Sequence, residues 1–341
     1  MNLLICVGEN YRDFAPLNQY VQNIARNHFG IVHQMLFCDS VDEALDMRNA
    51  KQCLIAMPQQ DFSQFVTLMQ AQTKIECKSI EEFVMFVSSD KCNIWLVDLL
   101  KAQNLAHLKP TSIKQSLLYL YPLGIDATSV KMLLSGIAKD FGVSVCVLNA
   151  DSNLEILSAT NGDLQNFKRE VEGTFGDKIF STFHLEQSII ALLESKNLKL
   201  ATAESCTGGL IAYSLTKQSG ASNVFDGGVI SYANAIKEAW LGVSAENLSQ
   251  FGAVSEAVVR EMLNGALKLS GADFALATSG VAGPSGGSAS KPVGTVYIGA
   301  KSVDGAEIIE RLYFKGNRNY IQEQAVLYAQ LLFLKIFLKN Y

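Results

Sequence analysis

The sequence predicts an α/β protein of three consecutive parts: a doubly wound N-terminal domain, a small α-β-β-α linking module and a C-terminal α/β domain. Strands and helices alternate along the first hundred residues, which is typical of a parallel sheet. A helix, two strands and a second helix follow, and then come three apolar strands that each end in polar or glycine-rich residues. At 341 residues the chain has room for two or three domains. We place the boundaries at 1–115, 116–181 and 182–341.

In the first part, apolar runs of strand length alternate with stretches of helical periodicity. The expected strands are 3–7, 31–37, 53–57 and 94–99, and the expected helices are 17–29, 41–48 and 62–72. The segment 110–122, which begins and ends in proline, is the expected boundary.

The linking module should open with a helix over 128–141, because Val130, Leu133, Leu134 and Ile137 share one helical face. Two strands, 143–148 and 154–158, are joined by the turn residues 150–153, and a second helix covers 167–172. A module of roughly 60 residues buries little surface alone, so we expect contacts with the neighbouring domains to stabilise it.

The C-terminal part alternates in the same way. Ser255 is a suitable N-cap for a helix that ends at Gly271. The expected helices are 185–195, 210–217, 236–241, 256–269 and 320–338, and the expected strands are 200–205, 224–232, 274–279, 293–300 and 308–314.

Composition excludes several classes of protein. A net charge of -5 and the absence of any basic run argue against nucleic-acid and membrane partners. The seven cysteines include no C-x-x-C pair, which indicates reduced thiols, a cytoplasmic location and no zinc site. The first residues lack a positive region and a cleavage site, so we expect a strand there rather than a signal peptide. The apolar run 331–338 contains Lys335 and is too short to span a bilayer, so it should end a core helix.

Three chemically active segments each follow a predicted strand: 204–209, 231–237 and 278–287. Ligands of open α/β sheets bind beyond the carboxyl ends of the strands, so these segments should converge. The first one also opens a helix, whose free N–H groups and dipole favour an anion. We therefore expect the site at this edge.

Ser205 is the candidate nucleophile, and it needs a base to accept its proton. The four histidines are His28, His33, His107 and His184, so none follows position 184. Lys237 is the best remaining base, in a Ser-Lys arrangement that requires a neutral amine and hence a pKa lowered by burial or a nearby cation. Tyr232 is placed to relay a proton or position the leaving group. The alternative is that Ser205 only caps the helix, Lys237 is solvated and Tyr232 belongs to the core.

Three further groups have two interpretations each. Cys206 is a rival nucleophile, but adjacent side chains diverge and we favour Ser205. The loop 280–287 is either an anion cradle or a hairpin loop, since it matches neither G-x-G-x-x-G nor a P-loop. Arg318, before the last helix, either holds a phosphate in bidentate fashion or is an ordinary surface arginine.

These segments closely resemble the C-terminal domain of the CinA family, which is named for competence- and damage-inducible proteins and also occurs alone as nicotinamide-nucleotide amidase. The resemblance runs from about residue 185 to the C-terminus, in order and at compatible spacing. It is carried by 203–209 (AESCTGG), 228–234 (GVISYAN) with Lys237, 252–255 (GAVS), 279–287 (SGVAGPSGG) and 291–296 (KPVGTV).

The resemblance implies a serine-type amidase that converts nicotinamide mononucleotide to nicotinate mononucleotide and ammonia, in pyridine nucleotide salvage and without a metal or other cofactor. The nucleophile corresponds to Ser205 and the lysine to Lys237. N–H groups near Thr207, Gly208 and Gly209 should hold the oxyanion. The phosphate is expected at Arg318 and the loop glycines Gly280, Gly283, Gly286 and Gly287. The substrate is then a small nucleotide, and the family's habit of pairing implies a homodimer.

The other two parts resemble the longer family members less closely. The segment 116–181 is similar to their KH-like linking module, with 119–125 at its first strand, but it has no G-x-x-G loop. The N-terminal part is similar to a molybdopterin-biosynthesis-like domain with metal-dependent ADP-ribose pyrophosphatase activity. The family's glycine-rich run and acidic pair are missing after the third strand, so we expect a degenerate domain with a scaffolding or dimerising role. The alternatives to an amidase are a non-catalytic nucleotide-binding scaffold and a retained pyrophosphatase.

Overall fold

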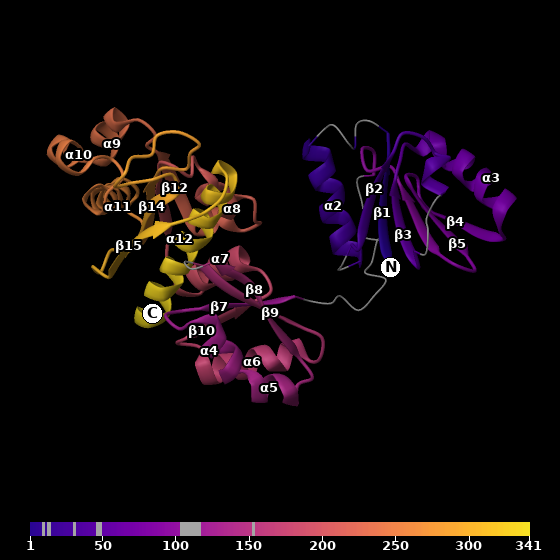
Figure 1. The fold of residues 1–341 in the computed structure, drawn as a ribbon, viewed down its shortest axis with the longest axis horizontal. Coiled ribbons are helices and arrows are strands. Elements are labelled where there is room, and N and C mark those ends of the chain that lie inside the picture. The colour runs from indigo at the N-terminus through magenta and orange to yellow at the C-terminus, as the bar shows by residue number, and fades with distance from the viewer. Residues whose placement is uncertain (9–10, 12–14, 30–31, 46–49, 103–116, 152–153) are drawn as a thin grey trace. The chain divides into compact units, whose positions relative to one another are not determined.

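The protein is described by a computed structural model in which two compact units follow each other along the chain, Met1–Ser116 and Leu117–Tyr341 (Figure 1). The structure describes residues 1–8, 11, 15–29, 32–45, 50–102, 117–151 and 154–341. The expected boundary between residues 115 and 116 and most of the proline-flanked segment 110–122 lie outside these ranges, as do parts of the expected helix 41–48 and of the turn 150–153.

Among the described residues, the first unit contains one mixed sheet of six strands in the order β2-β1-β3-β6-β5-β4. Strands β2, β1, β3 and β6 are parallel, while β5 and β4 are antiparallel at one edge. The elements are β1 (Asn2–Val7), α2 (Ala15–Phe29), β2 (Gln34–Cys38), η1 (Glu43–Leu45), β3 (Gln52–Ala56), η2 (Gln59–Asp61), α3 (Phe62–Gln72), β4 (Ile75–Glu81), β5 (Val84–Ser89) and β6 (Asn93–Val97).

The parallel half of this sheet agrees with the sequence prediction, and the antiparallel half was not predicted. Strands β1, β3 and β6 are buried on both faces, so they are visible as continuous apolar runs. The β4–β5 hairpin carries mostly exposed and half-buried residues, and β4 contains Glu76, Lys78 and Glu81. The alternation in β4 is therefore too polar to be recognised as a strand, whereas β5 begins with four apolar residues and was missed although this signal was present.

The second unit begins with the linking module, a four-stranded antiparallel sheet in the order β10-β7-β9-β8. Its elements are β7 (Leu118–Pro122), α4 (Ala127–Leu133), α5 (Ser135–Asp140), β8 (Ser144–Asp151), β9 (Leu154–Thr160), α6 (Leu164–Phe175) and β10 (Ile179–Thr182). The predicted α-β-β-α pattern is thus framed by strands β7 and β10.

The single helix predicted over 128–141 is interrupted at Leu134. Leu134 is fully buried, whereas Leu133, which was expected on the same face, is 42% exposed. The Ser135 hydroxyl donates to the Met132 carbonyl beside the break, and Gly136 follows. A hydroxyl that bonds the backbone locally and a glycine both weaken a helix. The interruption is short, because the Leu134 N–H still donates to the Val130 carbonyl and the Ala138 N–H to the Leu134 carbonyl.

The rest of the second unit is a five-stranded sheet in the order β12-β11-β13-β14-β15. Strands β12, β11 and β13 are parallel, and β14 and β15 complete the sheet in antiparallel fashion. The elements are α7 (Leu185–Lys196), β11 (Leu200–Glu204), α8 (Leu210–Thr216), η3 (Ala221–Asn223), β12 (Phe225–Ile230), α9 (Asn234–Leu241), α10 (Ala245–Phe251), α11 (Glu256–Ser270), β13 (Phe274–Gly280), β14 (Thr295–Ser302), β15 (Glu307–Tyr313) and α12 (Arg318–Asn340).

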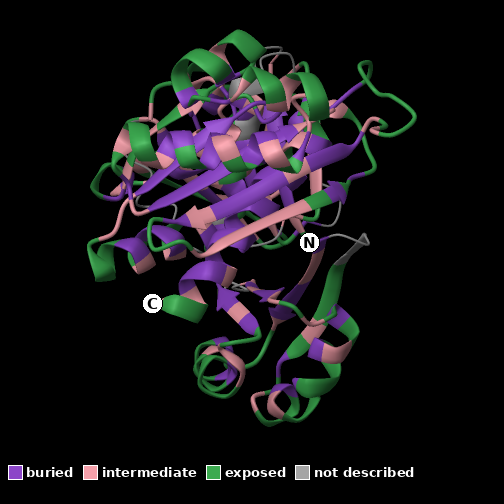
Figure 2. Cartoon of the chain, turned by 90° about the vertical axis from the view of Figure 1, so that its left-hand side faces the viewer, coloured by how far each residue is buried: buried purple, intermediate pink, exposed green. Residues whose placement is uncertain are grey.

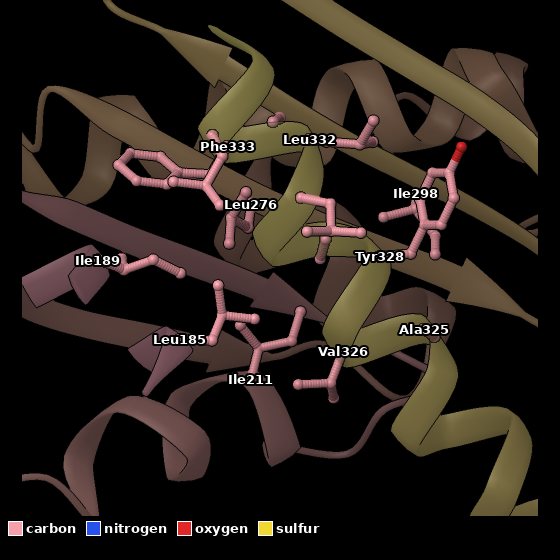
Figure 3. Close-up of a cluster of buried hydrophobic side chains, with 14 of the residues drawn as sticks. Leu185, Ile189, Ile211, Leu276, Ile298, Ala325, Val326, Tyr328, Leu332 and Phe333 are labelled. Carbon is pink, nitrogen blue, oxygen red and sulfur yellow. The ribbon is translucent and has the colours of Figure 1, made fainter. Parts of the chain in front are cut away.

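Helices cover both faces of this sheet. On one face α11 packs on Ala203, Ala275 and Ala277, small residues that let the helix approach closely. On the other face α7, α8 and α12 enclose a larger apolar core, in which residues of β13 and β14 meet those of α12 (Figure 3). Figure 2 shows the buried residues concentrated in the strands, with exposed residues on the outer sides of the helices.

Helix α12 is the centre of the second unit. Tyr121 of β7 and Leu154 of β9 belong to the same core cluster as α12, so the linking module rests on this helix. Among the described residues, α12 is the one helix whose length and composition would allow it to cross a membrane, and 67% of its apolar window is buried inside the protein. Its apolar character is explained by this burial, as expected for 331–338.

Candidate active site

The site is built at the carboxyl ends of β11, β12 and β13, which are parallel neighbours in the five-stranded sheet. The chain leaves β11 at Ser205, whose N–H donates to the Thr278 carbonyl of β13 at 3.0 Å. The Ser231 N–H donates to the Glu204 carbonyl at 2.8 Å, which joins the end of β12 to the same point. The three segments singled out in the sequence are therefore adjacent.

A tight turn carries Ser205 into α8. The Gly208 N–H donates to the Ser205 carbonyl at 3.2 Å, and Gly208 and Gly209 have φ values of 63° and 98°. Non-glycine residues rarely adopt such values, so both glycines are needed for the turn. This requirement accounts for the Thr-Gly-Gly sequence that follows Ser205 and Cys206.

The buried carboxylate of Glu204 closes the N-terminus of α8. It accepts hydrogen bonds from the Thr207 hydroxyl at 2.7 Å and from the N–H groups of Gly209, Ile211 and Ala212 at 3.0, 3.0 and 2.9 Å. Glu204 is only 1% exposed. The sequence suggested that this helix terminus is open to a ligand, but the structure fills it with Glu204, because a buried carboxylate needs donors and the first N–H groups of a helix need acceptors.

Two N–H groups of the turn are left over. Within the described part of the chain, the N–H groups of Cys206 and Thr207 have no hydrogen-bond partner in another residue. The Gly208 and Gly209 N–H groups, which were expected to help hold an oxyanion, are occupied by Ser205 and Glu204. The N–H donors available beside Ser205 are thus those of Cys206 and Thr207, one residue earlier in the chain than expected.

Lys237 reaches Ser205 from α9. Its Nζ lies 3.0 Å from Ser205 Oγ and also donates to the Ser231 carbonyl. Ser205 is 9% exposed and Lys237 is 1% exposed, so this lysine is not the solvated residue of the alternative interpretation. Burial lowers the pKa of the Lys237 amine, and the nearby Cys206 opposes this shift. We find no ion pair between Lys237 and a carboxylate in the described ranges.

This environment favours the neutral amine that a Ser-Lys pair requires. A neutral amine can donate to the Ser231 carbonyl and still offer its lone pair to the Ser205 hydroxyl proton. Geometry and burial therefore agree with the chemistry expected of Ser205 and Lys237.

The Cys206 side chain packs into the apolar core next to the site, near Thr278 and Lys237. It belongs to the cluster around α12, and burial raises the pKa of its thiol to about 12. A thiol with such a pKa is almost entirely protonated at neutral pH and is a poor nucleophile. Ser205 is the better placed of the two adjacent candidates.

Tyr232 and Arg318 form a second group at the edge of the site. The Arg318 guanidinium donates to the Tyr232 hydroxyl at 3.0 Å and to the Gly283 carbonyl at 2.8 Å. Tyr232 is 63% exposed, and no hydrogen bond between it and Ser205 or Lys237 is found among the described residues. The structure thus places Tyr232 beside Arg318 and not between Ser205 and Lys237.

The glycine-rich loop is joined to this group by the Gly283 carbonyl, which accepts from Arg318. Gly280 ends β13 against β14, where an added Cβ would lie 2.8 Å from the Thr295 carbonyl oxygen, so its role is close packing. Gly286 and Gly287 lie on an exposed stretch, and no contact between them and Ser205 is seen in the residues that the structure describes. The four loop glycines that were expected together at the phosphate therefore lie in different environments.

The C-terminal part of the chain is similar to known proteins. The sequence profile of the CinA C-terminal domain matches residues 182–337. The nicotinamide-nucleotide amidohydrolase PncC of Enterobacter agglomerans is 47% identical over 156 residues, which are 46% of this chain and 95% of that protein. The chain belongs to the CinA family.

Other CinA-family proteins match over the same region. A CinA-like protein of Anaeromyxobacter sp. (strain K) is 42% identical over 174 residues, 50% of this chain but only 42% of that protein's length. The crystal structure of the competence/damage inducible protein CihA from Agrobacterium tumefaciens is 42% identical and covers 46% of this chain and 94% of its own, with a TM-score of 0.43.

Sequence reasoning missed three parts of the site. The acceptor role of Glu204 had one available signal, an acidic residue between a buried strand and a helix start. The Ser231 carbonyl is a main-chain group, so the amino-acid type at this position does not indicate its role. Gln322 of α12 donates to the Cys206 carbonyl at 2.6 Å from 116 positions away, and nothing in the local sequence indicates that contact.

The described residues contain no group of three or more His, Cys, Asp or Glu side chains that could hold a metal ion. The polar groups described above are the Ser205 and Tyr232 hydroxyls, the Lys237 amine, the Glu204 carboxylate, the Arg318 guanidinium, the Gln322 amide and main-chain groups.

Proposed function

We propose that this protein is a serine-type amidase that hydrolyses nicotinamide mononucleotide to nicotinate mononucleotide and ammonia. The observation that carries the proposal is the 3.0 Å contact between Ser205 Oγ and the buried Lys237 Nζ. A second support is the relative from Enterobacter agglomerans, which is named a nicotinamide-nucleotide amidohydrolase and is covered almost completely.

The reaction starts with proton transfer from Ser205 to Lys237. Ser205 Oγ attacks the carboxamide carbon, and the C=O electrons move to oxygen. The N–H groups of Cys206 and Thr207 hold this oxyanion; one such donor typically contributes about 3–4 kcal/mol to transition-state stabilisation. The C–N bond then breaks, and Lys237 returns its proton to the nitrogen, which leaves as ammonia.

Water completes the turnover. Lys237, neutral again, accepts a proton from a water molecule that attacks the ester carbon. The bond to Ser205 Oγ breaks and Ser205 regains a proton from Lys237. The product leaves as the nicotinate mononucleotide carboxylate, and its carboxyl proton passes to solvent. One lysine thus acts alternately as base and acid in both halves of the reaction.

Arg318 is the proposed phosphate ligand. Its guanidinium is always charged and matches phosphate oxygens in bidentate geometry. This guanidinium donates to the Tyr232 hydroxyl and to the Gly283 carbonyl, which hold it at the edge of the site.

Ammonia release from nicotinamide mononucleotide by the purified full chain tests the proposal. We expect turnover in the wild type, none with Ser205→Ala and almost none with Lys237→Ala. Cys206→Ala should keep most of the activity, and its loss together with an active Ser205→Ala would identify the thiol as nucleophile. A wild-type protein that is folded, binds the nucleotide and releases no ammonia would support the scaffold alternative.

We further propose a cytoplasmic homodimer as the working form. Sedimentation of the full chain at micromolar concentration distinguishes a dimer of about twice 37.2 kDa from a monomer.

A further inference from the structure

The turn after Ser205 is closed by one hydrogen bond, and the peptide group in the middle of the turn takes no part in it. That bond joins the Gly208 N–H to the Ser205 carbonyl at 3.2 Å, so the middle peptide links Cys206 to Thr207. The two common β-turn types differ mainly in the orientation of this peptide. Thr207 is not among the residues with positive φ, which favours the orientation of a type I turn. A contact from outside the turn can hold this orientation more firmly.

Gln322 supplies that contact. Its Nε2 donates to the Cys206 carbonyl oxygen at 2.6 Å, and its side chain is half-buried. Gln322 lies in the first turns of α12, whose start is capped by the Asn317 side chain accepting from the Tyr320 N–H at 3.0 Å. The rest of α12 is packed in the core, so the donor is mounted on a rigid element.

A fixed carbonyl determines where the opposite N–H points. The peptide group is planar and trans, so the Cys206 C=O and the Thr207 N–H point in opposite directions. Accepting a hydrogen bond at the carbonyl also polarises the peptide and strengthens its N–H as a donor. The Thr207 side chain is held independently by Glu204 and Thr278, at 2.7 and 2.8 Å. Both ends of this peptide are thus anchored, and its N–H has no partner among the described residues.

We propose that Gln322 is a positioning residue that holds the Cys206–Thr207 peptide so that the Thr207 N–H faces the developing oxyanion. Gln322 itself touches neither the substrate nor Ser205. This proposal rests on the proposed amidase function, because the oxyanion forms when Ser205 attacks a carbonyl carbon.

The test measures two rates for the variants Gln322→Ala and Gln322→Glu. Gln322→Glu places a hydrogen-bond acceptor where the Cys206 carbonyl needs a donor. The first rate is ammonia release from nicotinamide mononucleotide. The second is phosphonylation of Ser205 by a fluorophosphonate, followed by intact mass: an Oγ–P bond forms, fluoride leaves, and the proton passes to Lys237. We expect both variants to slow both steps by about 10- to 100-fold with KM changed less than about twofold, part of the effect of losing an oxyanion donor. Gln322→Lys keeps a donor and should stay within about fivefold of the wild type.

Gln330 provides a matched control on the same helix. Its Nε2 donates to Ser214 Oγ at 2.9 Å, a buried contact between α12 and α8 that does not involve the turn. Gln330→Ala should lower the thermal midpoint at least as much as Gln322→Ala and leave both rates within about twofold. A merely structural role of Gln322 would make the two variants behave alike.

Each outcome decides one of the two proposals. Rates of Gln322→Ala and Gln322→Glu within twofold of the wild type would overturn the role of Gln322. A wild type that is phosphonylated at Ser205 but releases no ammonia would contradict the proposed substrate, while the phosphonylation rates would still decide on Gln322. A wild type that does neither would overturn both.

Discussion

Lys237 Nζ lies 3.0 Å from Ser205 Oγ in a setting where the lysine is 1% exposed and its other hydrogen bond goes to the main-chain carbonyl of Ser231. A charged amine in this position would lack a counter-ion, because no carboxylate forms an ion pair with it within the described residues. Burial therefore lowers the pKa of Lys237, which favours the neutral form that the proposed mechanism requires as the acceptor of the Ser205 proton.

The first prediction concerns the pH dependence of amide hydrolysis. Because the neutral amine is the active form, kcat/KM should rise with pH to a plateau, with an apparent pKa below the ordinary lysine value of 10.5. Lys237→Arg stays charged at every pH and should be at least about 10³-fold slower, without this rise. His184→Asn should keep the wild-type profile. A profile that is flat in the wild type, or that moves with His184→Asn, would contradict the role of Lys237.

The same shift has a consequence for stability. Between the lowered pKa of the folded state and the ordinary value of 10.5, the unfolded chain binds a proton that the folded chain does not. The contribution of Lys237 to the free energy of unfolding should therefore increase with pH across this window and level off above 10.5. Lys237→Met should flatten that part of the stability curve, as measured by urea unfolding at a series of pH values.

The second prediction concerns Glu204. Its carboxylate accepts four hydrogen bonds, three of them from the start of α8. Glu204→Ala should leave these donors unsatisfied in a buried place and lower the free energy of unfolding by about 3 kcal/mol, measured by urea unfolding. Glu256→Gln is a suitable control, since the exposed Glu256–Arg260 pair should contribute less than about 1 kcal/mol. If Glu204→Ala and Glu256→Gln lower the free energy of unfolding equally, the hydrogen bonds of Glu204 do not stabilise the start of α8 as expected.

Much of this site could be predicted from the sequence, because the ends of strands and the positions of glycines are visible in the local sequence. Ser205, Lys237 and the loop at Gly283 each follow an apolar strand, and parallel strands bring their carboxyl ends together. What the sequence could not predict are contacts made by main-chain groups or across long separations, such as the Ser231 carbonyl and Gln322. Strand β4 and the break at Leu134 were missed because polar alternation and a local hydroxyl contact are weak signals compared with apolar periodicity. Strand β5 was missed although it begins with four apolar residues.

The third prediction tests Arg318 as the phosphate ligand. A charged hydrogen bond to phosphate typically contributes about 1.5–3 kcal/mol, so Arg318→Ala should lower kcat/KM for nicotinamide mononucleotide by about 10- to 100-fold. Nicotinamide riboside lacks the phosphate, and its slower hydrolysis should change less than about threefold. Arg311 is the control, because it donates to the Ser290 carbonyl of the same loop. If Arg318→Ala affects both substrates equally, the arginine shapes the loop and does not bind the phosphate.

The fourth prediction concerns the first unit, which we expect to lack ADP-ribose pyrophosphatase activity. After β3 the chain passes through Pro58 directly into η2 and α3. The buried Asp98 carboxylate accepts from the N–H groups of Gln59 and Leu100 at 3.0 and 3.2 Å, which ties it to the fold. AMP formation from ADP-ribose with Mg²⁺ or Mn²⁺ should stay at background in a preparation that releases ammonia from nicotinamide mononucleotide. Metal-dependent AMP formation would show that this domain is not degenerate.

The last prediction concerns the packing that holds Lys237 in place. Helix α9 carries Lys237 and lies against α11 at Gly265, where an added Cβ would be 2.1 Å from the Leu241 carbonyl oxygen and 2.7 Å from its Cα. Both contacts are with backbone, so α9 must move to accept a methyl group. Gly265→Ala should lower the free energy of unfolding by about 1–3 kcal/mol and reduce kcat, because Lys237 Nζ is displaced from Ser205.

Gly173→Ala is the matched control for this variant. Gly173 lies within α6 with no atom within 4 Å of an added Cβ, so the same substitution should raise stability by about 0.5–1 kcal/mol and leave ammonia release unchanged. Urea unfolding and kcat are measured for both variants. A Gly265→Ala protein that loses stability but keeps the wild-type kcat would mean that the shift is absorbed by α11, and that the position of Lys237 is fixed by its contacts with Ser231 and Ser205 instead of by helix packing.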